Sequence, residues 1–129
     1  MSAIRLLLVD DESEFLDLMR KRLSRRNVEL TVASGGEEAL ALAATQRFDV
    51  IVLDVRMPGM DGLEILERLR SVDHRAEVLL LTGHASVESA RKGLELGAFD
   101  YLLKPVPINE FLFRIQDACQ RSRLRAGRG

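Results

Sequence analysis

Acidic side chains and one lysine stand at the ends of apolar runs in this chain. Asp10, Asp11 and Glu12 follow the first run, and Asp54 ends another near the middle of the sequence. Lys104 closes a third run, directly before Pro105. Carboxylate oxygens are ligands that hard divalent cations such as Mg²⁺ prefer. Carboxylates also act as nucleophiles toward phosphoryl donors and form acyl phosphates. These residue types therefore predict phosphoryl-transfer chemistry.

The grouping of acids has two interpretations, a cation site and a helix cap. If the run before Asp10 and the run that ends at Asp54 are neighbouring strands, Asp10, Asp11 and Asp54 lie together at one edge of the sheet, which we call the mouth. Two like charges about 4 Å apart repel by about 1 kcal/mol in water and about 4 kcal/mol at an effective dielectric of 20. A divalent cation would remove most of that cost. Alternatively, Asp10, Asp11 and Glu12 only cap the helix that follows, since acids favour helix N-termini. Two consecutive aspartates plus a third from another strand favour the cation.

Asp54 is the stronger candidate for the reactive group. A metal bridging the acceptor and the incoming phosphoryl oxygens would neutralise developing charge. Lys104 can reach the same oxygens, and the Thr82 hydroxyl can donate a hydrogen bond to one. The turn at Pro58 leaves backbone carbonyls free, and that of Arg56 is placed to ligate the metal. Plainer roles remain open. Lys104 could be an exposed lysine of an edge strand, Thr82 could cap the end of a strand, and Pro58 could belong to an ordinary turn.

Composition limits the class of protein. The 129 residues suit one domain with a sizeable core, and they are 47% hydrophobic and 30% charged. A net charge of −1 gives no general attraction to nucleic acid or anionic membranes. No apolar stretch approaches the ~20 residues that span a bilayer, and no signal peptide is present. The single cysteine, Cys119, cannot form an internal disulfide. We therefore expect a cytoplasmic protein.

Strand-like and helix-like segments alternate along the chain. The predicted strands are residues 4–9, 29–33, 50–55, 77–82 and 100–103. Three of them are continuously apolar, as expected for parallel strands covered on both faces. Such alternation predicts an α/β fold, a doubly wound three-layer sandwich whose site lies beyond the carboxyl ends of the strands. Two helix starts have capping-box spacing, Ser34 with Glu37 and Asp61 with Glu64.

The chain resembles a known family, the receiver domains of two-component response regulators. The resemblance covers nearly the whole chain and rests on four segments in order. They are LLVDDE at 7–12, LDVRMPGMDG at 53–62, LTGH at 81–84 and GAFDYLLKP at 97–105. The family implies a flavodoxin-like fold, with five helices and a five-stranded parallel sheet in the order 2-1-3-4-5.

The resemblance also implies roles for residues. Asp54 matches the phosphoacceptor, which takes a phosphoryl group from a histidine kinase or a phosphotransfer protein. Asp10 and Asp11 match the acidic pair that holds Mg²⁺, with Asp11 a direct ligand and Asp10 acting through water. Arg56 matches the position that offers its backbone carbonyl to the metal. Lys104 matches the lysine that pairs with the phosphate.

A switch is implied as well. Thr82 and Tyr101 match the pair whose side chains reorient on phosphorylation. The readout face would comprise the fourth helix, fifth strand and fifth helix, around Ala90 and Phe111, and would support a homodimer of the phosphorylated form. The family also implies a cis peptide bond before Pro105. Such a domain assists its own phosphorylation and slow dephosphorylation but is not a turnover enzyme.

Other interpretations are weaker. A Mg²⁺-dependent phosphohydrolase would use an aspartate after the first strand, which here is Asp10. A nucleotide-binding fold would need G-x-G-x-x-G at the first turn, which is absent. Direct nucleic-acid binding is not expected, because no helix-turn-helix follows. We expect a receiver at residues 1–122 and an arginine-rich tail or linker at 123–129.

Overall fold

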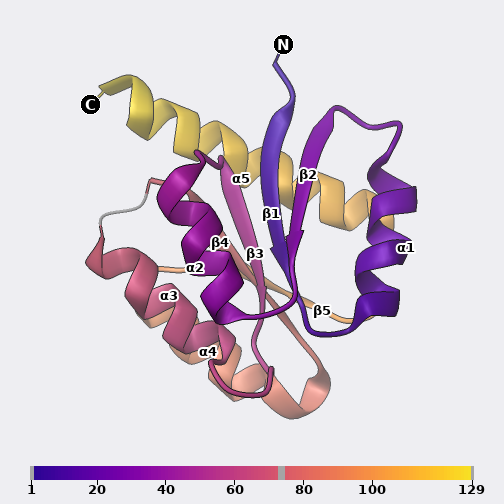
Figure 1. Ribbon diagram of the computed structural model, residues 1–129, viewed down its shortest axis with the longest axis vertical. Helices are drawn as coiled ribbons and strands as arrows, with labels where there is room; N and C mark the ends of the chain where they lie inside the picture. Colours follow the sequence, from indigo (N-terminus) through magenta and orange to yellow (C-terminus); the bar gives the residue numbers. More distant parts are fainter. Residues whose placement is uncertain (1, 73–74, 129) are drawn as a thin grey trace.

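Five parallel strands form the central sheet of the protein, in the order β2-β1-β3-β4-β5 (Figure 1). The computed structural model describes residues 2–72 and 75–128. The strands are β1 (Ile4–Val9), β2 (Val28–Ala33), β3 (Val50–Asp54), β4 (Glu77–Thr82) and β5 (Asp100–Leu103). The predicted fold class and strand order are confirmed, and the strand limits differ from the predicted ones by one residue at β2 and β3.

Helices cover both faces of the sheet and make it the middle of three layers (Figure 1). They are α1 (Ser13–Leu23), α2 (Gly36–Thr45), α3 (Gly62–Ser71), α4 (Val87–Glu95) and α5 (Ile108–Arg128), with a short 3₁₀ turn, η1 (His84–Ser86), before α4. Apolar residues of α1 and α5 pack in one core cluster, and those of α2, α3 and α4 pack in the other. Within residues 2–72 and 75–128, no helix combines the length and apolar character needed to cross a bilayer.

The continuously apolar strands are explained by burial on both faces. Successive side chains of a strand point to opposite sides of the sheet. In β1, Leu6 and Leu8 join the α1/α5 cluster, whereas Leu7 and Val9 join the cluster beneath α2, α3 and α4. All four are fully buried. Each such side chain contributes about 1.5–3 kcal/mol by leaving water, so this strand is firmly fixed and holds the residue after it in place.

Helix α3 begins in close contact with the end of β3. The predicted cap is confirmed, because the Asp61 carboxylate accepts a hydrogen bond from the Glu64 N–H at 2.9 Å. A Cβ at Gly62 would lie 2.5 Å from the backbone carbonyl oxygen of Asp54. Only glycine therefore lets this helix start so near the candidate acceptor.

The predicted cap of α2 is wrong by one residue. The helix starts at Gly36, and Gly35 is its N-cap without a side-chain cap. The Ser34 N–H donates to the carboxylate of Glu38 at 2.8 Å, and not to Glu37. Because the helix starts at Gly36, Glu38 rather than Glu37 lies within reach of the Ser34 N–H.

The arginines of the predicted tail or linker are part of a helix. Helix α5 continues to Arg128. Arg121 and Arg125 form ion pairs with Glu77, which is buried at the start of β4. Arg123 pairs with Asp49 at 3.1 Å. These contacts hold the last turns of α5 against the edge where the strands begin.

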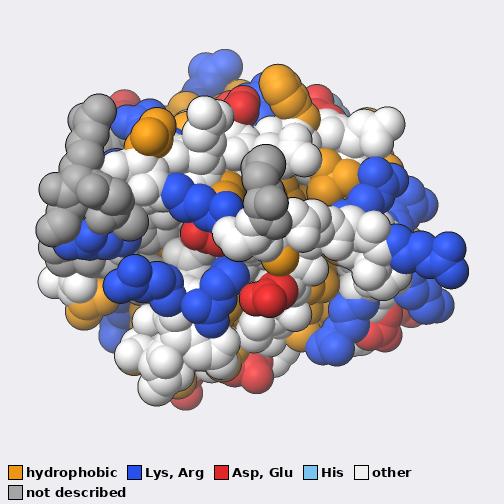
Figure 2. Space-filling view, turned by 90° about the horizontal axis from the view of Figure 1, so that it is seen from above, with side chains coloured by type: hydrophobic (Ala, Val, Ile, Leu, Met, Phe, Trp, Pro, Cys, Tyr) orange, Lys and Arg blue, Asp and Glu red, His pale blue; other side chains and the backbone are white. Residues whose placement is uncertain are grey.

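Positive charge gathers at this end of the molecule. Figure 2 views the protein from the end where the strands begin, and lysine and arginine side chains outnumber acidic ones there. Since the net charge is only −1, the acidic side chains are concentrated elsewhere. The candidate site lies at the opposite end, beyond the carboxyl ends of the strands.

Candidate phosphoryl-transfer site

The ends of four strands bring the predicted site residues together. Strands β1 and β3 are neighbours, as supposed from the sequence, and Val9 pairs with Leu53. Asp10 directly follows β1, and Asp54 is the last residue of β3. Thr82 ends β4, and its carbonyl accepts a hydrogen bond from the Lys104 N–H at 2.9 Å. Parallel register therefore places these residues at one mouth.

The Lys104 ammonium is the centre of this mouth. Its Nζ lies 2.7 Å from Asp10 Oδ2, 3.2 Å from Glu12 Oε1 and 3.4 Å from Asp54 Oδ2. The peptide bond between Lys104 and Pro105 is cis, as expected. The lysine thus partly offsets the repulsion among three carboxylates that approach from two different strands and a loop.

The two buried aspartates differ in what their oxygens can do. Asp10 is completely buried, and both of its oxygens accept hydrogen bonds, from the Glu12 N–H at 2.9 Å and from Lys104. Asp54 is 7% exposed, and its contacts to the Arg56 N–H and to Lys104 are longer, at 3.2 and 3.4 Å. Asp54 is therefore the better placed of the two to attack a donor arriving from solvent.

The electrostatics of the mouth raise the pKa of Asp54 to about 6. Burial is the largest cause, and the negative charge of Asp10 adds to it. Lys104 and the Arg56 N–H act in the opposite direction but do not outweigh them. For Lys104, burial alone would lower the pKa, but the hydrogen bond and charge of Asp10, with the other acids, raise it overall. At neutral pH the Asp54 carboxylate is therefore mostly ionised.

Three carboxylates in the mouth could hold a metal ion. One oxygen from each of Asp10, Glu12 and Asp54 lies within 4.8 Å of the others. An all-oxygen donor set of this kind fits Mg²⁺. Asp11 is exposed and lies outside this group, so its role as a ligand stays a prediction.

The sequence places Glu12 among the acidic residues of the site but does not identify it as a metal ligand. The sequence offered a signal, since Glu12 is the third acid of a consecutive run. We interpreted it both as a member of the acidic group and as a possible cap of the helix that follows. Glu12 does occupy the N-cap position of α1, but its side chain makes no cap hydrogen bond and reaches Lys104 instead.

The remaining predicted residues surround the mouth. The Thr82 side chain is buried, and its hydroxyl donates to the Gly83 carbonyl at 3.0 Å. Tyr101 is half-buried and packs against the cluster beneath α2, α3 and α4. Arg56 is exposed and contacts Asp54 through its backbone N–H.

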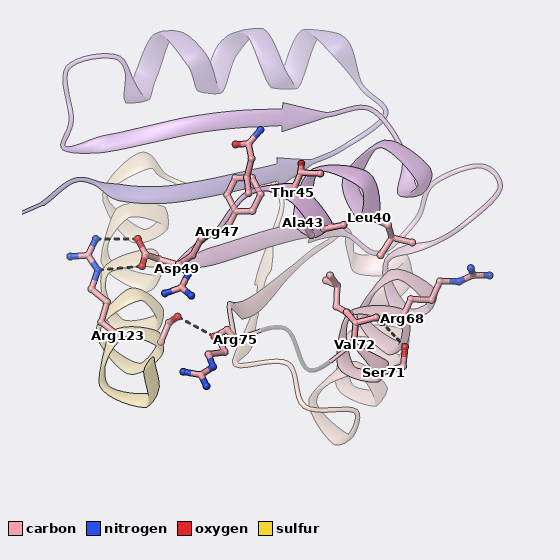
Figure 3. A pocket seen from close by; sticks show the side chains of 15 residues that line it. Leu40, Ala43, Thr45, Arg47, Asp49, Arg68, Ser71, Val72, Arg75 and Arg123 are labelled. Atoms are coloured by element: carbon pink, nitrogen blue, oxygen red, sulfur yellow. Dashed lines mark hydrogen bonds and ion pairs between the residues drawn. The ribbon is translucent and has the colours of Figure 1, made fainter. Parts of the chain in front are cut away.

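Two hollows in the surface have different relations to the mouth. A cavity of about 530 Å³ borders it and is lined by Val55, Arg56, Met57, Pro58, Asp61 and Ser89. A larger hollow of about 1000 Å³ lies where the strands begin, between the C-terminal ends of α2 and α3 and helix α5 (Figure 3). There, Asp49 is joined to Arg123, and the Ser122 hydroxyl donates to the Arg75 carbonyl. None of the predicted site residues is among the described residues that line this larger hollow.

The family model and the curated relatives agree on one family. Residues 6–116 match the model of the response regulator receiver domain. The chain is 40% identical over 119 residues to the response regulator MprA of Mycolicibacterium vanbaalenii, covering 92% of this chain and 52% of that protein. It is 40% identical over 121 residues to the regulatory protein AtoC of Escherichia coli K12, covering 93% of this chain and 26% of that protein.

A solved structure agrees with these sequence matches. The receiver domain of the Francisella response regulator 1452 superposes with a TM-score of 0.84 at 34% identity, over 92% of this chain and 98% of that one. The chain therefore spans the length of that isolated domain, but only about half of MprA and about a quarter of AtoC.

Proposed function

Because the chain belongs to the receiver domain family of two-component response regulators, we propose that Asp54 is the phosphoacceptor of a signalling switch. Response regulator receivers interact with histidine kinases or phosphotransfer proteins, and phosphorylation is their general switch. The observation that carries the proposal for this chain is the geometry of Asp54. Its carboxylate is partly accessible, lies 3.4 Å from the Lys104 ammonium and ends a buried strand that fixes its position.

The proposed transfer uses the unprotonated Asp54 carboxylate. With a pKa of about 6, this carboxylate is mostly ionised at neutral pH. One of its oxygens attacks phosphorus, the P–N bond to the donor histidine breaks, and the histidine nitrogen keeps the electron pair. Lys104 pairs with the oxygens of the transferred group, and the Thr82 hydroxyl donates to one of them. Charge-assisted hydrogen bonds of this kind contribute about 1.5–3 kcal/mol each.

We assign Mg²⁺ as the metal of this site. Asp11, Asp54 and the Arg56 backbone carbonyl are the proposed direct ligands, with Asp10 acting through water and Glu12 close enough to join them. Bound Mg²⁺ supplies positive charge that offsets the charge developing on the phosphoryl oxygens. The oxygen-only donor set at the mouth supports this assignment.

The output of the switch is proposed to be the face formed by α4, β5 and α5. Thr82 moves toward the phosphoryl oxygens, and Tyr101 fills the space that it leaves. To go from mostly inactive to mostly active, phosphorylation must favour the active state by about 5.5 kcal/mol. Two or three charge-assisted hydrogen bonds are of that order. The face then binds a second copy or an output partner, and the domain acts in the cytoplasm as a switch without enzymatic turnover.

A hydrolase that uses Asp10 as its nucleophile is the alternative. The burial of Asp10 and the hydrogen bonds to both of its oxygens favour Asp54 instead. The test is phosphorylation with phosphoramidate and Mg²⁺, followed by peptide mass spectrometry. We expect one phosphoryl group on the peptide that contains Asp54, present in the Asp10→Asn variant at a lower rate and absent in Asp54→Asn. A phosphoryl group on Asp10 would support the hydrolase and exclude the switch.

A further inference from the structure

The ring of Phe15 lies beside the Lys104 ammonium, with Nζ 4.5 Å from the ring centroid. A cation within about 6 Å of an aromatic face is attracted by the ring quadrupole. We propose that Phe15 is a positioning residue for Lys104. Its ring holds the Lys104 ammonium over the acidic mouth and accepts no hydrogen bond from that ammonium. This inference rests on the proposed function, since it concerns the lysine that would pair with the phosphoryl group.

The arrangement around Nζ supports a role for an aromatic ring. An ammonium has three N–H donors, and three carboxylate oxygens already lie 2.7, 3.2 and 3.4 Å from it. The Lys104 side chain is only 21% exposed. Phe15 shields part of the ammonium from water and attracts it across a broad surface. A polar side chain in its place would take an N–H group that a phosphoryl oxygen needs.

Helix α1 fixes the position of the Phe15 ring. Glu12 and Phe15 are three residues apart, so they lie on the same side at the start of the helix. The helix is anchored because Leu16, Met19 and Leu23 are buried against the sheet. The start of α1 therefore offers Lys104 two contacts of different chemistry: a carboxylate that competes with the phosphoryl group for the lysine and a ring that does not.

A plain packing role is the competing explanation. Phe15 is half-buried and packs against the α1/α5 core cluster. Packing depends on apolar volume, whereas the attraction to Lys104 depends on the aromatic face. Phe15→Leu keeps an apolar side chain and removes the ring, and Phe15→Trp keeps a ring with a stronger attraction for cations.

The experiment measures the rate of Asp54 phosphorylation by phosphoramidate and Mg²⁺ in the full chain. Phe15→Leu is expected to lower the rate about 3- to 10-fold, and Phe15→Trp to restore at least the wild-type rate. In the Lys104→Ala background, Phe15→Leu is expected to cause no further loss. Leu18→Ala, at a 44% exposed position of the same helix, is the control and should leave the rate unchanged. An equal loss from Phe15→Leu with and without Lys104, or no rescue by tryptophan, would overturn the inference.

An NMR measurement separates this inference from the proposed function. The ring current of Phe15 should shift the Lys104 methylene protons next to Nζ, and Phe15→Leu should abolish that shift while Phe15→Trp retains one. If the wild type shows the shift but Asp54 is never labelled, the proposed function fails and the contact stands. If Asp54 is labelled normally and the Lys104 protons do not respond to Phe15→Leu, the inference fails and the proposed function stands.

Discussion

Replacing Asp54 with asparagine is expected to stabilise the metal-free protein at neutral pH. The Asp54 side chain is 10% exposed, and burial and the charge of Asp10 raise its pKa from 3.8 to about 6. Folding therefore places an ionised carboxylate where its charge is unfavourable. Asparagine has nearly the same shape and no charge, so it removes that penalty while it keeps a polar group at the mouth.

The size and pH dependence of the effect follow from the two pKa values. A shift of about two units corresponds to about 3 kcal/mol at most. Below pH 3.8 the carboxyl is protonated in both the folded and unfolded states, so it costs nothing. Between pH 3.8 and about 6 the penalty grows, because the unfolded state loses its proton first, and above pH 6 it is complete. The advantage of Asp54→Asn should therefore appear as pH rises through this window.

Asp49→Asn is a matched control with the opposite sign. Burial alone would raise the pKa of Asp49, but the hydrogen bond and charge of Arg123, with the Arg5 N–H, hold it below its usual value. Asp49 therefore contributes stability above the unfolded pKa of 3.8, and that contribution is lost as pH falls through the lower folded pKa. The same chemical change should destabilise the protein at neutral pH, and this effect should stay nearly constant down to pH 4.

The assay is urea unfolding followed by circular dichroism, with EDTA present, at several pH values from 4 to 8. We expect Asp54→Asn to unfold at higher urea than wild type at pH 7.5, with the two converging near pH 4. Asp49→Asn should unfold at lower urea than wild type at pH 7.5. The reasoning is refuted if Asp54→Asn is the less stable protein at pH 7.5, or if its difference from wild type does not change with pH.

Two further predictions concern the same mouth. The Lys104→Ala variant should bind Mg²⁺ about 10-fold more tightly by calorimetry, because a positive charge no longer opposes the metal at Asp54. Its rate of phosphorylation should fall. Unchanged Mg²⁺ affinity would show that the lysine lies too far from the metal to affect its binding. Gly62→Ala should lower the free energy of unfolding by about 1–3 kcal/mol, since its Cβ would lie 2.5 Å from the Asp54 carbonyl oxygen. Gly83→Ala, with nothing within 4 Å of the added Cβ, should stay within about 0.5 kcal/mol of wild type, and equal effects at both glycines would contradict the steric argument.

Much of the site could be predicted because it follows from topology. Asp10, Asp54, Thr82 and Lys104 each stand at the carboxyl end of an apolar strand, and parallel strands bring those ends to one edge of the sheet. The predicted cap at Asp61 is also confirmed, since it depends only on residues three positions apart. Local patterns combined with strand direction were therefore enough to find these residues.

The features that were missed depend on details that spacing does not specify. Glu12 fits a helix cap and a metal cluster equally well by sequence, and only the direction of its side chain decides between them. The ring of Phe15 looks like one more apolar residue of α1 until Lys104 is placed beside it. The arginines of α5 suggested a tail, because their partner Glu77 is distant in the sequence and becomes a neighbour only through packing.

The most direct test of the central claim is a crystal structure of the protein with Mg²⁺ and beryllofluoride, a mimic of the phosphoryl group. We expect beryllium bonded to an Asp54 carboxylate oxygen, Lys104 Nζ in contact with a fluoride, and Mg²⁺ bound by the neighbouring acidic side chains. Beryllofluoride on Asp10, or its absence from Asp54 when the metal is bound, would contradict the account.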